Sequence, residues 1–257
     1  MAEKQYVHAP EVPVLCYPNS GSSLIAGVLH HLGINMGGRL KQAQLVNPLG
    51  LYEDESFSNI LGKIWFRYNI SPRYRRRIDQ DRLLAIGARY QGQLAALIRR
   101  RQQPGGAWGV KEPRLSLLWP LLTPYLQNPC WIVADRDIKQ MTRSRYAKLN
   151  RRFSRYRLDN IAYYIGQGHY FTILSYLTNS LRFLNISQSE LQAVITHYYD
   201  LLDAFVADKK YLKIYYENLI QHPEEEIDNI IRFLSIQPDQ TRIAAAVGFV
   251  RPALRHF

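Results

Sequence analysis

Cysteine is scarce in this chain and long apolar runs are missing, and each shortage argues against a class of protein. The 257 residues include two cysteines, Cys16 and Cys130, which fits a reducing compartment and no disulfide framework. No apolar run approaches the ~18 residues that a membrane span needs. The first five residues, Met-Ala-Glu-Lys-Gln, lack the basic-then-apolar pattern of a secretory signal. We therefore expect a cytoplasmic protein.

Several familiar ligand-binding patterns are also missing. No Gly-Lys-Ser/Thr occurs, so the standard nucleoside-triphosphate loop is absent, and Gly166-x-Gly168 meets Phe171 where the dinucleotide pattern needs a glycine. The cysteines are far apart and no HxxxH or HxH pattern occurs, so we expect no metal site. Without zinc-finger spacing, an RNP-type aromatic motif or a clear helix-turn-helix, we do not expect nucleic acid as the partner.

Acidic residues are outnumbered by basic ones. The chain has 33 Lys and Arg against 21 Asp and Glu, a net charge of +12, which implies an anionic partner. The densest basic run spans residues 143–157 and is interleaved with Tyr146, Phe153 and Tyr156. It is either a solvated face or a surface that lines an acceptor cleft or contacts an acidic acceptor or a membrane.

Short apolar runs alternate with longer amphipathic segments, which predicts an α/β fold. The expected strands cover residues 13–17, 108–111, 130–134 and 212–216, and the expected helices cover 22–32, 57–68, 79–101, 138–144, 189–206 and 224–234. This order favours a three-layer domain whose mainly parallel central sheet is flanked by helices. We expect one domain over 1–257, with a Tyr- and Arg-rich insertion or lid at about 148–185. A packed helical subdomain is the alternative there.

The turn after the first expected strand has the composition of an anion site. Ser20, Gly21, Ser22 and Ser23 stand between a buried strand and a helix, where free backbone N–H groups and the helix dipole attract phosphate or sulfate. The serines add hydroxyl donors, and Gly21 lets the backbone approach a ligand. An ordinary helix N-cap is the alternative interpretation of these serines.

A second anion site is predicted one strand along. Arg136 follows the strand at 130–134, and Ser144 lies eight positions later, after a short expected helix. A bidentate arginine and a short hydroxyl donor can converge on one phosphate. Two such sites on adjacent strands suggest a nucleotide that is phosphorylated at both ends of its ribose.

Taken in order, six segments resemble the PAPS-dependent sulfotransferases, bacterial members above all, whose donor is 3′-phosphoadenosine-5′-phosphosulfate (PAPS). The resemblance implies a P-loop-like sulfotransferase fold and transfer of a sulfuryl group to a hydroxyl or amine acceptor, with release of 3′-phosphoadenosine 5′-phosphate (PAP). It covers nearly the whole chain except about 148–185. The segments are residues 17–23, Gly50-Leu51-Tyr52-Glu53-Asp54, Lys111-Glu112-Pro113-Arg114, the Arg136/Ser144 pair, Tyr216-Glu217-Asn218-Leu219 and Pro252-Ala253-Leu254-Arg255-His256.

The resemblance also implies roles for single residues. Asn19 and the serines with Gly21 would hold the 5′-phosphosulfate, Arg136 and Ser144 the 3′-phosphate, and Arg255 would add a donor contact. Members of the family usually have Lys or Arg where Asn19 stands, so Lys111 is our candidate for the missing cation, ahead of Arg39 and Lys41.

Glu53 is the expected general base, with Asp54 as runner-up. Charge compensation at a helix N-terminus is the alternative role of Glu53, and solvated charges are the alternative roles of Lys111 and Arg255. Other functions stay open for the chain: a catalytically weak nucleotide-binding relative, or a nucleic-acid or anionic-surface binder. The sequence predicts neither the identity of the acceptor nor the oligomeric state. An anionic acceptor would suit the basic run.

Overall fold

The computed structural model describes residues 8–41, 50–70, 77–150, 164–166, 168–183 and 185–250. Its centre is a sheet of four parallel strands in the order β2-β1-β3-β4. The strands are β1 (Glu11–Leu15), β2 (Trp108–Lys111), β3 (Trp131–Asp135) and β4 (Tyr211–Tyr215). All four expected strands are present, and three of them begin one or two residues earlier or later than expected.

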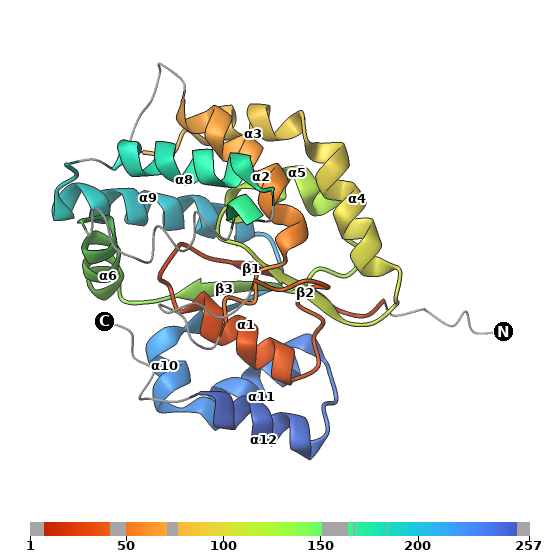
Figure 1. The fold of residues 1–257 in the computed structure, drawn as a ribbon. Helices are drawn as coiled ribbons and strands as arrows, with labels where there is room; N and C mark the ends of the chain where they lie inside the picture. Colours follow the sequence, from red (N-terminus) through yellow and green to blue (C-terminus); the bar gives the residue numbers. More distant parts are fainter. Residues whose placement is uncertain are drawn as a thin grey trace.

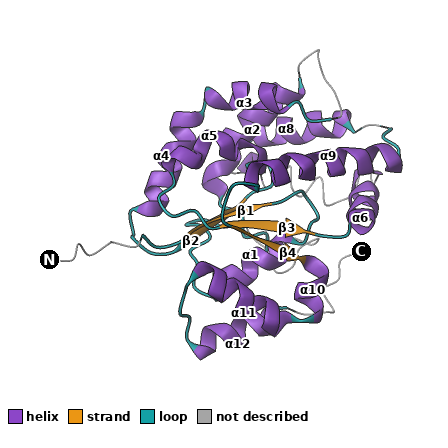
Figure 2. Cartoon of the chain, turned by 180° about the vertical axis from the view of Figure 1, so that it is seen from behind, coloured by secondary structure: helices purple, strands orange, loops and turns teal. Residues whose placement is uncertain are grey.

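Helices cover both faces of the sheet, so the molecule has three layers (Figures 1 and 2). On one face lie α1 (Ser22–His31), α10 (Tyr216–Gln221), α11 (Pro223–Leu234) and α12 (Gln240–Phe249). On the other lie α2 (Glu55–Asn69), α3 (Gln80–Ala88), α4 (Gln91–Gln102), α5 (Trp119–Leu122), α6 (Ile138–Asn150), α8 (Tyr170–Arg182) and α9 (Gln188–Val206). Two 3₁₀ turns, η1 (Ser116–Leu118) and η2 (Thr123–Tyr125), flank α5.

The alternating direction of side chains along each strand explains why helices cover both faces of the sheet. In β3, Trp131 and Val133 join the core beneath the larger helical layer, whereas Ile132 and Ala134 join the core beside α1 and α11. Successive side chains of a strand point to opposite faces, so strands that are apolar throughout must be covered on both. The two cores therefore follow from the short apolar runs of the sequence.

Two expected helices differ in extent. The segment expected as one helix over 79–101 forms α3 and α4, with a break at Arg89 and Tyr90. Both parts bury apolar residues, among them Leu83 and Leu94, so the apolar spacing alone did not reveal the break. The helix expected at 138–144 continues to Asn150 as α6.

The region expected as an insertion or lid is described only in part, because residues 151–163 lie outside the described residues. Within it, α8 packs along α2, where Gly62 lets the two backbones approach. A Cβ atom at Gly62 would lie 2.6 Å from the backbone nitrogen of Thr172. Thr172 Oγ1 also donates to the carbonyl of Ser58 at 2.9 Å. The described part is thus a helix fixed to α2, while its role as a lid stays a prediction.

Candidate anion-binding active site

The predicted anion turn lies at the carboxyl end of β1 and leads directly into α1. Asn19 and Gly21 both have left-handed backbones, with φ of 76° and 83°. At Gly21 a Cβ atom would lie 2.3 Å from Cδ2 of Tyr216, so only glycine fits beneath that ring. Gly21 caps α1 without a side-chain hydrogen bond, and the first turn of α1 contains no acidic residue. The N–H groups at this helix end and its dipole therefore have no negative side chain of their own helix to satisfy them.

The structure brings Asn19, Arg136 and Ser144 together on one side of this turn. Asn19 Nδ2 donates to Ser144 Oγ at 2.8 Å, and the Arg136 guanidinium donates to the Asn19 carbonyl at 3.4 Å. These contacts span 125 and 117 residues of sequence. Because Ser144 Oγ accepts from Asn19, its own hydroxyl hydrogen can be donated to a ligand.

The Arg136 side chain is held beside this turn by ring stacking and not by a short ion pair. Its guanidinium lies over the Tyr216 ring, 4.6 Å from the centroid. Its ion pair with Glu217 is long, at 3.8 Å. The positive charge is therefore fixed in place by stacking and remains available to an anion beside the α1 N-terminus.

A buried chain of ion pairs lies on the other side of the turn. Lys111, at the end of β2, contacts Ser23 Oγ at 3.3 Å and Glu53 Oε1 at 2.8 Å. Lys41 binds the other oxygen of Glu53 at 2.6 Å and also reaches Glu112 at 3.2 Å. We call these residues, together with Arg114, the charge chain. It connects β2, the α1 N-terminus and the segment before α2.

Arg114 closes the far end of the charge chain. Its guanidinium donates to both oxygens of Glu112, Nε at 3.1 Å and Nη2 at 2.8 Å. Burial by itself would raise the pKa of Glu112, but Arg114 and Lys41 outweigh it and hold this pKa well below the ordinary value. Burial by itself would lower the pKa of Lys41, but Glu112 and Glu53 hold it well above the ordinary value. Three cations face two carboxylates, so the charge chain carries one positive charge in excess.

Tyrosines on α9 fix the strand ends that present both groups. Tyr198 donates to the carbonyl of Pro113 at 2.8 Å, and Tyr199 donates to the carbonyl of Ala134 at 2.8 Å. Nearby, Cys16 is fully buried and burial raises the pKa of its thiol to about 11. A thiol with such a pKa stays protonated at neutral pH and is not a nucleophile.

Several expected site residues have structural contacts instead of a place at the turn. Asp54, the alternative base, caps α2 by accepting from Ser56 N at 2.9 Å. Arg39 pairs with Glu55 at 2.6 Å, and 66% of its side chain is exposed. Trp119 and Trp131, considered for adenine stacking, are buried against each other with ring centroids 5.4 Å apart.

Arg255 lies outside the described residues, so its expected donor contact stays a prediction. The sequence analysis gave Lys41 only as a weaker candidate for the missing cation, and it gave Glu112 no role of its own. The signal was the Lys-Glu-Pro-Arg end of β2, but nothing in it revealed a partner 71 residues away.

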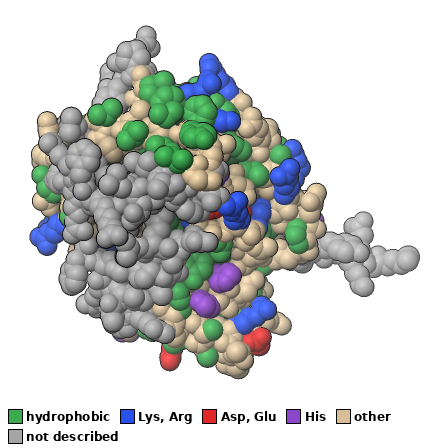
Figure 3. All heavy atoms as spheres, viewed as in Figure 1, with side chains coloured by type: hydrophobic (Ala, Val, Ile, Leu, Met, Phe, Trp, Pro, Cys, Tyr) green, Lys and Arg blue, Asp and Glu red, His purple; other side chains and the backbone are tan. Residues whose placement is uncertain are grey.

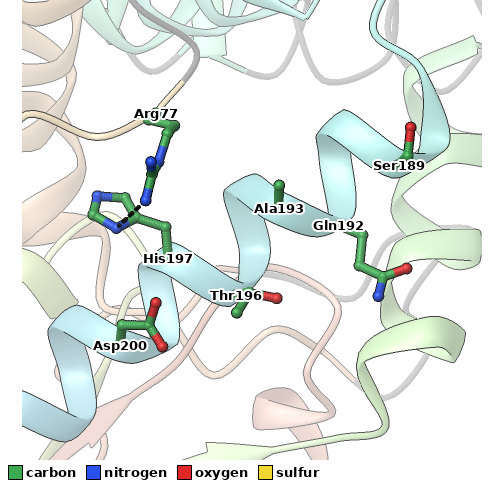
Figure 4. A pocket seen from close by; sticks show the side chains of 7 residues that line it. All are labelled: Arg77, Ser189, Gln192, Ala193, Thr196, His197 and Asp200. Atoms are coloured by element: carbon green, nitrogen blue, oxygen red, sulfur yellow. Dashed lines mark hydrogen bonds between the residues drawn. The ribbon is translucent and has the colours of Figure 1, made fainter.

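A separate pocket of about 490 Å³ lies along α9, away from the turn. Its lining includes Arg77, Gln192, His197 and Asp200 (Figure 4). Arg77 donates to His197 Nδ1 at 3.3 Å, and the opposite ring nitrogen lies 3.0 Å from the carbonyl of Ile78. Both histidine nitrogens thus have protein partners. In the described part of the chain, no cluster of three His, Cys, Asp or Glu side chains could hold a metal ion, and no helix is long and apolar enough to cross a bilayer.

Comparisons with known proteins bear on the fold. No protein-family model matches the sequence, and no curated protein matches it. Among solved structures, sulfotransferase STF9 from Mycobacterium avium aligns over 95% of this chain and 68% of its own, with a TM-score of 0.50 and 12% identity. The chain has the sulfotransferase fold. The sulfotransferase domain of the Synechococcus PCC 7002 olefin synthase also aligns, over 95% of this chain and 85% of its own, with a TM-score of 0.49 and 16% identity.

The charge chain generates a stability prediction. Replacing Lys41 by Met leaves Glu53 and Glu112 short of a buried partner, so Lys41→Met should lower the free energy of unfolding by about 3–5 kcal/mol. Arg232→Met is the control, because the ion pair of Arg232 with Asp228 on α11 is exposed on both sides and should contribute less than about 1 kcal/mol. Urea unfolding at pH 7 measures both. Equal, small losses in the two variants would show that the charge chain does not hold this region together.

Proposed function

We propose that the protein is a sulfotransferase that moves a sulfuryl group from PAPS to a hydroxyl or amine acceptor and releases PAP. The observation that carries this proposal is the convergence of Asn19, Arg136 and Ser144 beside the N-terminus of α1, which has no side-chain cap. The shared fold supports it. A donor with phosphate groups at two ends of one ribose suits a turn that has cationic groups on both of its sides.

In this proposal the two sides of the turn divide the donor between them. Arg136 and Ser144 bind the 3′-phosphate through charge-assisted hydrogen bonds. The amides and hydroxyls of residues 20–23 bind the 5′-phosphosulfate at the helix N-terminus. Lys111 lies beyond Ser23, so the sulfuryl end points toward Lys111 and Glu53. Arg255 is a further predicted donor contact.

The transfer step then uses groups at the Lys111 side. The acceptor oxygen or nitrogen attacks sulfur, a bond forms between them, and the bond from sulfur to the bridging oxygen breaks. That electron pair stays on the 5′-phosphate of PAP, and the acceptor proton passes to a base. Lys111 would stabilise the charge on the departing phosphate. Asn19 adds a neutral hydrogen-bond donor.

Glu53 is the proposed base, and it has two buried neighbours that affect this role. Its carboxylate accepts from Lys111 on Oε1 and from Lys41 on Oε2. These contacts fix the orientation of the carboxylate relative to Lys111. An acceptor hydroxyl that displaces one lysine contact would reach an oxygen already placed near the sulfuryl group.

Arg136 provides the direct test of donor binding. Arg136→Ala should weaken PAP binding by about 1.5–3 kcal/mol, because a charge-assisted contact to the 3′-phosphate is lost. Arg143→Ala is the control, since Arg143 is an exposed residue of α6 and should bind PAP as the wild type does. Isothermal titration calorimetry measures both. Equal affinities of Arg136→Ala and the wild type would exclude Arg136 from the 3′-phosphate site.

Asn19 favours a second candidate function, a nucleotide-binding relative with little catalysis. Asn donates a hydrogen bond but brings no charge to the departing phosphate. If Lys111 supplies that charge, Asn19→Lys should change turnover of sulfuryl transfer by less than about tenfold. The variant Asn19→Met is the control for charge, because it shares with Asn19→Lys the longer side chain, the lost Ser144 contact and the strain of a left-handed backbone, but brings no cation. A wild type without turnover that gains it in Asn19→Lys would establish the binding relative.

A further inference from the structure

The outer face of α8 carries an unusual concentration of apolar surface. The structure describes ten exposed large hydrophobic side chains, and seven of them fall between residues 165 and 181. We call these seven the α8 patch: Ile165, Tyr170, Phe171, Leu174, Tyr176, Leu177 and Leu181. Figure 3 shows green side chains gathered over this helix. Contiguous exposed apolar patches on a folded protein mark sites of interaction.

The amphipathicity of α8 is inverted relative to a helix that covers a core. Its buried residues are Thr172, Ser175 and Arg182. Thr172 bonds the carbonyl of Ser58 on α2, and Arg182 lies over the ring of Tyr68 on α2. Tyr170, Leu174, Leu177 and Leu181 recur at helical spacing on the side away from α2, and Leu181 is 69% exposed. If α8 were rotated about its axis so that the opposite face packed on α2, these apolar side chains would be buried. The described part of the chain leaves these apolar side chains uncovered, so we infer that another surface covers them.

The charge around the α8 patch indicates which surface that is. Lys63 on α2 lies over the ring of Phe171, 5.6 Å from its centroid, and Arg67 is exposed one turn further along α2. Neither residues 56–78 nor residues 160–189 contain any Asp or Glu. An apolar helix face with a basic surround is the pattern of helices that lie in the interface of an anionic bilayer.

We propose that the α8 patch docks the protein on an anionic lipid bilayer, with its leucines and aromatic rings in the acyl boundary and the cations of α2 on the lipid headgroups. A second copy of this chain fits the patch less well. Joining two such faces would bring the basic rims of two molecules, each of net charge +12, against each other. This proposal concerns a surface and stands independently of the sulfuryl-transfer proposal.

Vesicle co-sedimentation of the full chain tests the docking surface. The probes are phosphatidylcholine vesicles with and without 30% phosphatidylglycerol, at about 0.1 and 0.5 M NaCl. We expect binding to the anionic vesicles that falls with salt. Combined Leu174→Gln, Leu177→Gln and Leu181→Gln should weaken this binding by roughly tenfold or more, since both the apolar and the electrostatic parts contribute. Combined Lys63→Gln and Arg67→Gln should weaken it and reduce its dependence on salt.

Two controls keep the test decisive. Tyr211→Gln with Tyr215→Gln removes exposed apolar side chains elsewhere, on β4, and should leave vesicle binding unchanged. Leu181→Gln alone replaces the triple variant if that variant unfolds by circular dichroism. Absent binding of the wild type, or equal binding of wild type and patch variants, would overturn the proposal. Sedimentation velocity without vesicles gives a further test. A wild-type dimer that the leucine variants dissociate would also overturn the proposal, because it would identify a second copy of the chain as the occupant of the patch.

Discussion

Buried ion pairs determine how the functional edge of this molecule is assembled. Lys111, Glu53, Lys41, Glu112 and Arg114 lie in one continuous chain at the end of β2, and each carboxylate accepts from two cations. Buried charges are tolerated only when they are paired and hydrogen-bonded. The segment before α2 contributes two of these residues, and β2 with the turn that follows it contributes three. Their mutual pairing therefore fixes a loop segment against the sheet beside the α1 N-terminus.

The surplus positive charge of that chain supports the proposed donor site. Three cations share two carboxylates there, and the adjacent helix begins with a glycine cap and no acidic residue. On the other side of the same turn, Arg136 is stacked on Tyr216 and has only a long ion pair. Positively charged side chains therefore lie on both sides of the turn. An anion that spans the turn would relieve both, which is the physical basis of the proposed donor site.

The sequence predicted the sheet well because parallel strands covered on both faces are short apolar runs with few charges. Arg136 and Ser144, which follow the same strand, both contact Asn19, while their role in binding a 3′-phosphate stays a prediction. The break between α3 and α4 was missed because the apolar residues on both sides still fit one helical period. Helix α8 was not among the expected helices, although its apolar residues recur at helical spacing, and a packed helical subdomain was the alternative for this region. Which face of α8 would be buried could not be predicted, because its Thr and Ser are buried and its apolar side chains are exposed. Ion pairs such as that of Lys41 with Glu112 join residues far apart in sequence, so no local pattern indicated them.

The most direct test of the account is a calorimetric titration of the wild type with PAP and, in parallel, with ADP. Each nucleotide carries two phosphate groups: PAP has one at the 5′ and one at the 3′ position, whereas ADP has both at the 5′ position. The account predicts that PAP binds at least roughly tenfold more tightly, because Arg136 and Ser144 add a charge-assisted contact. Equal affinity for the two nucleotides, or no binding of either, would contradict the two-sided anion site on which the proposed function depends.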